Sequence, residues 1–195
     1  MSVAESIAVI SALDVVRTVL GDYLPTRLAA YQSAETGLSV PAPSRYALAL
    51  SRSAVDEALQ NAAVACFVFQ SRPSDIVQEQ SGGATDYPAV QLTYVEIRVV
   101  YRSRLQAPYS PASWGSELTS SDILARRGYY YAAAVNEVMR RDLCCNSGGV
   151  ITEVISKDSD YAGAIYETDS QKIYGMTSMV YGLRQDIVVP YCAES

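Results

Sequence analysis

Four cysteines are the residues of this chain whose chemistry would be easiest to recognise, and their spacing fits no metal or redox motif. They are Cys66, Cys144, Cys145 and Cys192. Two of them are adjacent, none belongs to a Cys-x-x-Cys pattern, and the chain has no histidine to complete a mixed zinc site. Because free cysteine behaves as a small apolar side chain, we expect buried or incidental thiols, which suits a reducing cytoplasm.

The absence of histidine also removes the usual base of hydrolytic catalysis. Ser-His-Asp and Cys-His mechanisms need an imidazole that accepts a proton near neutral pH. Carboxylates could replace it, but the acidic residues follow no spacing that brings two of them together: Asp56, Glu57, Glu96, Glu117, Asp122, Glu137, Asp158 and Asp160. No glycine-rich phosphate-binding motif occurs. We therefore predict no catalytic, cofactor-binding or metal-binding residue. A small cytoplasmic enzyme, with carboxylates or Cys145 converging in a pocket, is the alternative.

The segment RRGYYYAAAVNEVMRRD, residues 126–142, could be a nucleic-acid-binding helix or a packing helix. The formal net charge of −6 and the pI near 4.7 oppose broad attraction to phosphates. Successive helical residues diverge by about 100°, so the tyrosines at 129–131 cannot form one base-stacking surface. The apolar residues instead recur along one helix face, as burial against a sheet requires: Leu124, Tyr131, Val135, Val138 and Met139. This pattern predicts a packing helix that begins at Ser120 or Ser121.

Residues 1–34 are predicted to be helical. Apolar side chains recur at roughly helical spacing at Val3, Ile7, Ile10, Leu13, Leu20 and Leu24, and further apolar area lies outside that stripe at Val9, Val15 and Val19. This helix needs cover on more than one side. The Gly21-Asp22 pair is expected to break it, with Pro25 starting a second short helix over 24–32. Charged residues inside the opening stretch argue against a signal peptide or a membrane span.

The remaining segments have strand character. Residues 63–69 form an apolar run, and residues 71–88 are polar enough for a loop or the turn of a long hairpin. In the next segment Val95, Ile97, Val99 and Tyr101 point one way, whereas Glu96, Arg98 and Arg102 point the other. Residues 150–156, 161–169 and 173–189 are predicted to form three more strands. Gly175 and Gly182 in the last one indicate bends, bulges or close approach of another backbone.

This order of elements predicts one α+β domain over residues 1–195. One long amphipathic helix packs on a mostly antiparallel sheet, with an N-terminal helical segment over about 1–34 and the sheet and helix core over about 63–189.

The chain resembles the tail terminator and related neck proteins of long-tailed bacteriophages. The resemblance rests on the order of elements together with LGDYLPTRLAAYQ and LSVPAP near the start, YPAVQLTYVEIRVVYR after a polar stretch, the RRGYYYAAAVNEVMRRD helix and the closing YGMTSMVYGLRQDIVV strand. It covers most of the chain as a pattern of elements. The extra length in the N-terminal helices and the loops, compared with the smallest members, leaves the position in the neck open.

The resemblance implies a structural protein of the virion, assembled in the host cytoplasm. Its copies would form a ring, usually a homohexamer, that caps the tail tube and docks the head-side connector, with DNA only passing through the lumen. That role requires no cofactor, catalytic group or membrane. Another neck component, an adaptor or a stopper, is the alternative within this class.

Five residues are the candidate interface contacts. Arg98 and Arg102 could form ion pairs across a subunit boundary or remain ordinary solvated strand charges. Tyr109 and Trp114 lie in a long proline-containing loop and could anchor an interface or pack locally. Tyr130 could meet a neighbouring copy, although packing within its own chain is the favoured interpretation.

Overall fold

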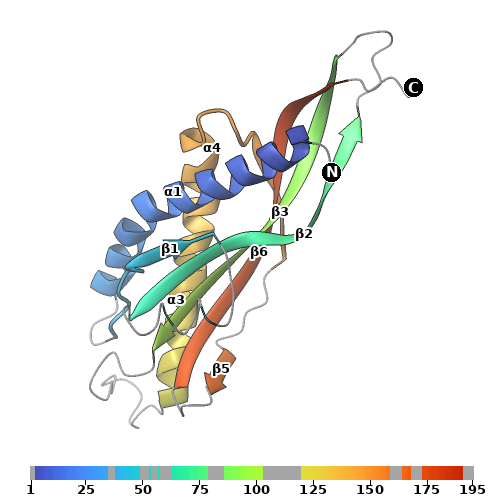
Figure 1. The fold of residues 1–195 in the computed structure, drawn as a ribbon. Helices are drawn as coiled ribbons and strands as arrows, with labels where there is room; N and C mark the ends of the chain where they lie inside the picture. The colour runs from blue at the N-terminus through green and yellow to red at the C-terminus, as the bar shows by residue number, and fades with distance from the viewer. Residues whose placement is uncertain are drawn as a thin grey trace.

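The computed structural model describes residues 3–34, 38–48, 53, 57, 63–78, 86–102, 120–158, 164–167 and 173–190. The fold is of the α+β type, with a six-stranded, mostly antiparallel sheet and helices packed on it (Figure 1). The elements run α1 (Val3–Ala34), β1 (Arg45–Ala47), β2 (Val64–Gln78), β3 (Asp86–Arg102), α3 (Ser120–Glu137), the π-helical turn η1 (Val138–Asp142), α4 (Leu143–Asn146), β4 (Glu153–Asp158), β5 (Ala164–Glu167) and β6 (Ile173–Pro190). Between β1 and β2, the described residues Ser53 and Glu57 are both helical.

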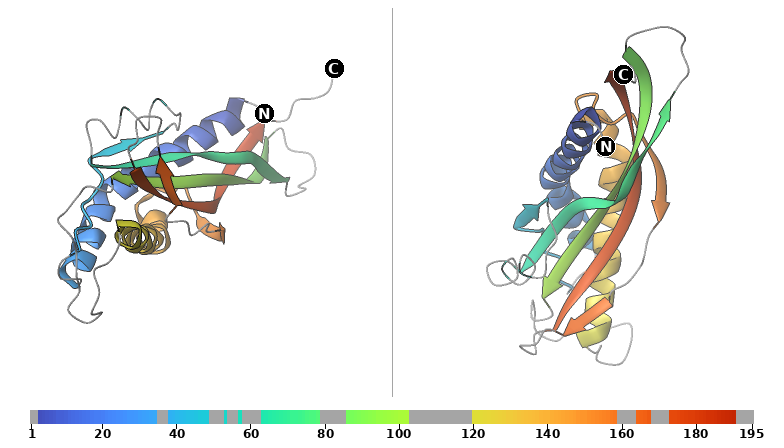
Figure 2. Two further views of the ribbon diagram at one scale, coloured as in Figure 1. Left: turned by 90° about the horizontal axis from the view of Figure 1, so that it is seen from below. Right: turned by 45° about the vertical axis from the view of Figure 1, so that its right-hand side comes forward.

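The sheet has the order β1-β2-β3-β6-β4, and β5 pairs with another part of β6. Strands β2, β3 and β6 are antiparallel neighbours, and among the described strands only β1 pairs in parallel, with the start of β2. The β3–β6 ladder runs from the pair Asp86 and Pro190 to the pair Arg102 and Tyr174. The sheet is strongly twisted, and the Asp86 end of β3 with the Pro190 end of β6 projects past the N-terminal end of α1 (Figure 2).

Both long helices lie on the same face of the sheet. The alternation predicted for β3 is confirmed: Val95, Ile97, Val99 and Tyr101 are fully buried, and their neighbours on β6 are Tyr181, Met179, Thr177 and Gly175. From this face Tyr101 donates a hydrogen bond to the carbonyl of Leu124 in α3, and Gln185 donates one to the carbonyl of Ala8 in α1. The opposite face is covered by neither α1 nor α3.

The N-terminal segment is one continuous helix, and the predicted break at Gly21-Asp22 is wrong. Pro25 lies inside α1. A proline within a helix costs a hydrogen bond and a steric contact with the preceding turn. Leu20, Leu24 and Leu28 are fully buried on both sides of Pro25, so packing on the sheet holds the helix together.

The side of α1 that faces the sheet also differs from the prediction. Val9 and Val19, expected outside the stripe, are buried, whereas Ile7 and Ile10 are 58% and 56% exposed. The reason is that apolar residues occur on nearly every side of this segment, so helical spacing alone could not select the inward face.

The described residues therefore include two long helices, α1 and α3, rather than one. The predicted packing helix is present as α3 continued by η1, and its stripe is buried as expected: Leu124, Tyr131, Val135, Val138 and Met139. Nothing in the sequence indicated the π turn. The prediction of one long amphipathic helix treated the N-terminal segment as two shorter helices.

The structure extends the strand predicted at 63–69 and explains one glycine of the last strand. Strand β2 continues through Gln78, so the first half of the polar stretch after Phe69 is strand with irregular register around Arg72, which fits the hairpin alternative. At Gly175 the close approach is by a side chain, not a backbone. The ring of Tyr101 occupies the space that a Cβ would need.

Candidate interface surfaces

Arg98 lies on the sheet face that α1 and α3 do not cover. Its Nε donates a hydrogen bond to Glu96 on the same strand, and Ser178 of β6 donates to the same carboxylate oxygen. The guanidinium also lies 5.0 Å from the centre of the Phe69 ring. Contacts within its own chain therefore hold Arg98 flat along the sheet, and an ion pair with a neighbouring copy remains a prediction.

A second cation lies on an aromatic ring farther along the sheet. The Cζ of Arg72 is 3.5 Å from the centre of the Tyr94 ring, and the Tyr94 hydroxyl donates to Asp75 at 2.8 Å. Cation–π pairs of this kind are mainly electrostatic and strengthen when water is excluded. These residues therefore form an ordered polar and aromatic surface.

The other residues predicted to lie at an interface are found in different parts of the molecule or outside its described residues. Arg102 is half-buried at the end of β3, where its backbone N–H donates to the carbonyl of Ala63 at 3.1 Å. Tyr109 and Trp114 lie outside the described residues, so their assignment stays a prediction. Arg98 and Arg102 share the even-numbered face of β3, but Tyr130 is on the helical layer, so the structure does not bring these three together.

Tyr130 packs within its own chain. Its ring lies against Tyr31 of α1, with centroids 5.6 Å apart and planes inclined by 47°. Beside this pair is a groove of about 670 Å³, lined by Tyr31 and by residues of α3: Asp122, Ala125, Arg126, Tyr129, Tyr130 and Ala133. Burial of Tyr31 and the negative charge of Glu137 raise the pKa of the Tyr31 hydroxyl. Tyr129 is 63% exposed.

Arg127 is a buried residue that the sequence interpretation missed. Its side chain is fully buried, and its Nε donates to the carbonyl of Ser39 at 2.8 Å. Burial lowers the pKa of Arg127, and the neighbouring Tyr131 and Tyr101 act in the opposite direction. Spacing could have revealed it, because residue 127 follows Leu124 by three positions and precedes Tyr131 by four, on the buried stripe itself.

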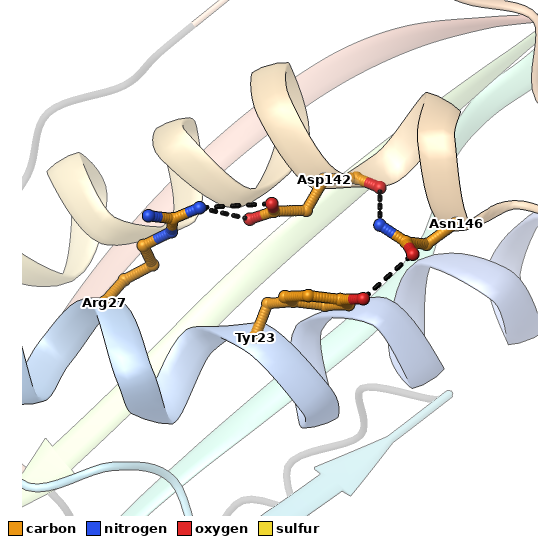
Figure 3. Close-up of polar contacts among 4 residues, drawn as sticks. All are labelled: Tyr23, Arg27, Asp142 and Asn146. Carbon is orange, nitrogen blue, oxygen red and sulfur yellow. Dashed lines mark hydrogen bonds and ion pairs between the residues drawn. The ribbon is translucent and has the colours of Figure 1, made fainter.

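A polar cluster joins α1 to the turn and short helix that follow α3 (Figure 3). One terminal nitrogen of Arg27 lies 3.1 Å from both carboxylate oxygens of Asp142. The Tyr23 hydroxyl donates to Asn146, whose amide nitrogen donates to the backbone carbonyl of Asp142. The π turn contributes the partner of Arg27, so this irregularity ties the two helical segments together.

The cysteines differ in their environments. Cys66 is fully buried and burial raises the pKa of its thiol to about 12, whereas Cys144 is half-buried and Cys145 is exposed. Within the described part of the chain, no group of three cysteine or acidic residues is placed to hold a metal ion. In the same residues, no helix has the length and apolar character needed to cross a membrane.

Large apolar side chains are exposed at one end of the molecule. Ile7 and Ile10 lie one helical turn apart near the start of α1, and Val188, near the end of β6, is 63% exposed. The hydrogen bond from Gln185 to Ala8 places these two segments side by side. Strand alternation turns Gln185 towards α1 and Val188 to the opposite face of the sheet, so the exposed apolar pair on this side consists of Ile7 and Ile10. Exposed apolar side chains that are neighbours on a helix are candidates for contact with another protein.

Comparison of the chain with models of protein families and with characterised proteins found no match.

Proposed function

We propose that this protein is a structural component of a bacteriophage virion, a tail terminator whose copies form a ring at the upper end of the tail tube. The proposal combines the sequence resemblance with the exposed aliphatic side chains Ile7 and Ile10 of α1, which are the observation that carries it. A ring requires two different surfaces on each copy that meet in a closed cycle. The N-terminal part of α1, where Ile7 and Ile10 are exposed, would supply one such surface.

The charge of the chain is compatible with a DNA channel. A net charge of −6 disfavours tight binding to the phosphate backbone, so passing DNA would not be retained. The polar and aromatic sheet face around Arg98 and Tyr94 offers a second surface, since tyrosine and arginine are enriched at interfaces.

The test is the mass of the assembly for the natural chain and for a variant with Ile7→Ser and Ile10→Ser. Both side chains are more than half exposed, so we expect the fold to tolerate the changes and the oligomer to dissociate. Ile155→Ser, at an exposed residue of β4, is the matched control and should assemble normally. An unchanged oligomer in the double variant would remove this surface from the proposed interface.

A further inference from the structure

The groove beside Tyr130 has an aromatic wall. The Tyr31 and Tyr130 rings, with centroids 5.6 Å apart and planes inclined by 47°, pack against each other and both line the groove. Tyr129 adds a third ring, which is 63% exposed. The small side chains of Ala125 and Ala133 also line the groove and leave space beside the rings. Aromatic walls with small residues between them favour a ligand that presents flat rings and little bulk elsewhere.

The lining has little net charge. Its charged residues are Asp122 and Arg126, of opposite formal charge and four positions apart on α3. A strongly charged ligand would gain little from such a lining. A neutral ligand with hydrogen-bonding backbone groups is the better match.

Proline-containing peptides have this chemistry. In the polyproline II conformation every third side chain lies on the same side, and the chain is extended beforehand, so little conformational entropy is lost when prolines dock on aromatic rings. The sequence of this protein contains such a stretch at 106–115, QAPYSPASWG, with Pro108 and Pro111 three positions apart and no charged residue. This stretch lies outside the described residues.

We propose that the groove formed by Tyr31, Tyr129 and Tyr130 binds the proline-containing stretch 106–115 of a neighbouring copy. This inference rests on the proposed ring, in which a surface of one copy must meet a different surface of the next. The groove would be one of these surfaces, and the stretch 106–115 would be its partner on the next copy.

Two variants change the groove and the proline-containing stretch separately. Tyr129→Ser removes an exposed ring from the groove, and Tyr129→Phe is its control because it keeps the ring. Pro108→Ala with Pro111→Ala alters the stretch and leaves the groove intact. We expect Tyr129→Ser and the double proline variant each to be monomeric, and their mixture to form dimers, because one intact groove then meets one intact stretch. Two monomers that stay monomeric on mixing would overturn the proposal.

A binding measurement tests the groove apart from the ring. The receptor is the double proline variant, and the probe is a fluorescein-labelled QAPYSPASWG peptide followed by fluorescence anisotropy. Adding Tyr129→Ser should weaken peptide binding by about tenfold or more, as loss of a central aromatic contact does, and adding Tyr129→Phe should change it little. A natural chain that forms rings while the peptide does not bind refutes the groove and leaves the ring standing. A natural chain that is monomeric while the peptide binds at Tyr129 refutes the ring and keeps the groove as a peptide site.

Discussion

Arg127 and the tyrosines around it show how single polar residues organise the interior. The rings of Tyr101 and Tyr131 lie 5.0 Å apart, and their hydroxyls donate to the carbonyls of Leu124 and Pro41. Arg127 donates to the carbonyl of Ser39 in the same connecting segment. Buried backbone carbonyls need such donors, because an unpaired one costs about 1–3 kcal/mol. These side chains therefore fix the segment after α1 against α3.

Replacing Arg127 should destabilise the protein strongly. Arg127→Ala leaves a cavity and removes the donor from the Ser39 carbonyl, so we expect the free energy of unfolding to fall by about 2–4 kcal/mol. Arg140→Ala, at an exposed residue of η1, should change it by less than about 0.5 kcal/mol. Urea unfolding measures both. Equal effects of the two substitutions would show that Arg127 is not buried in this way.

The free energy of unfolding should fall at alkaline pH because the buried Tyr101 hydroxyl ionises less readily in the folded chain than in the unfolded one. Burial raises the pKa of Tyr101 to about 12, above the value of about 10 expected in the unfolded chain. Below pH 10 both states are protonated and the contribution is complete; it is lost as pH rises towards 12 because only the unfolded state releases its proton. Unfolding free energies between pH 8 and pH 12 should decline above pH 10, by about 1.4 kcal/mol per pH unit for this group. Tyr101→Phe should have a shallower decline, and identical slopes would contradict the assignment.

At the scale of elements, helix α1 depends more on packing than on local signals. Its local sequence contains a glycine and a proline that usually interrupt helices, yet both lie within 32 continuous residues. Gln32 near its end donates to the carbonyl of Leu38 and accepts from the N–H of Val40, which reverses the chain towards β1. The end of this helix is therefore held by contacts with the segment that directly follows it, whereas its interior is held by packing on the sheet.

Gly21 provides a direct test of the continuous helix. A methyl group at this position meets nothing within 4 Å, so Gly21→Ala should stabilise the protein by about 0.5–1 kcal/mol, as in any helix interior. Gly175→Ala is the contrasting variant. There a Cβ would overlap the Tyr101 ring, and we expect a loss of about 1–3 kcal/mol. Thermal unfolding measures both, and destabilisation by Gly21→Ala would favour a break at this position.

Elements with one strong periodicity could be predicted from the sequence, and those without one could not. Strand β3 alternates up to Val99 and α3 carries a single apolar stripe, so both the type and the main buried face of each were predicted. Val100, buried on the opposite face, is the exception in β3. In α1 the apolar residues surround the helix, so its inward face is set by the shape of the sheet. The groove could not be predicted, because Tyr31 and Tyr130 are 99 positions apart in sequence and meet only in the folded chain.

In the molecule as a whole, the two faces of the sheet make different contacts. One face packs under α1 and α3 and forms the main core. The other carries a smaller buried cluster of Ala65, Phe67 and Val100 beside the half-buried polar and aromatic residues Arg98, Glu96 and Tyr94. The projecting ends of β3 and β6 extend beyond the helices. Such an arrangement leaves surfaces for neighbours on several sides, which is what a closed ring requires.

The mass of the purified protein at micromolar concentration, alone and mixed with tail tube protein, tests the ring most directly. We expect one discrete closed oligomer, formed by the protein alone or on meeting the tube protein, that dissociates when Ile7 and Ile10 are both replaced by serine. A chain that remains monomeric under both conditions would contradict it.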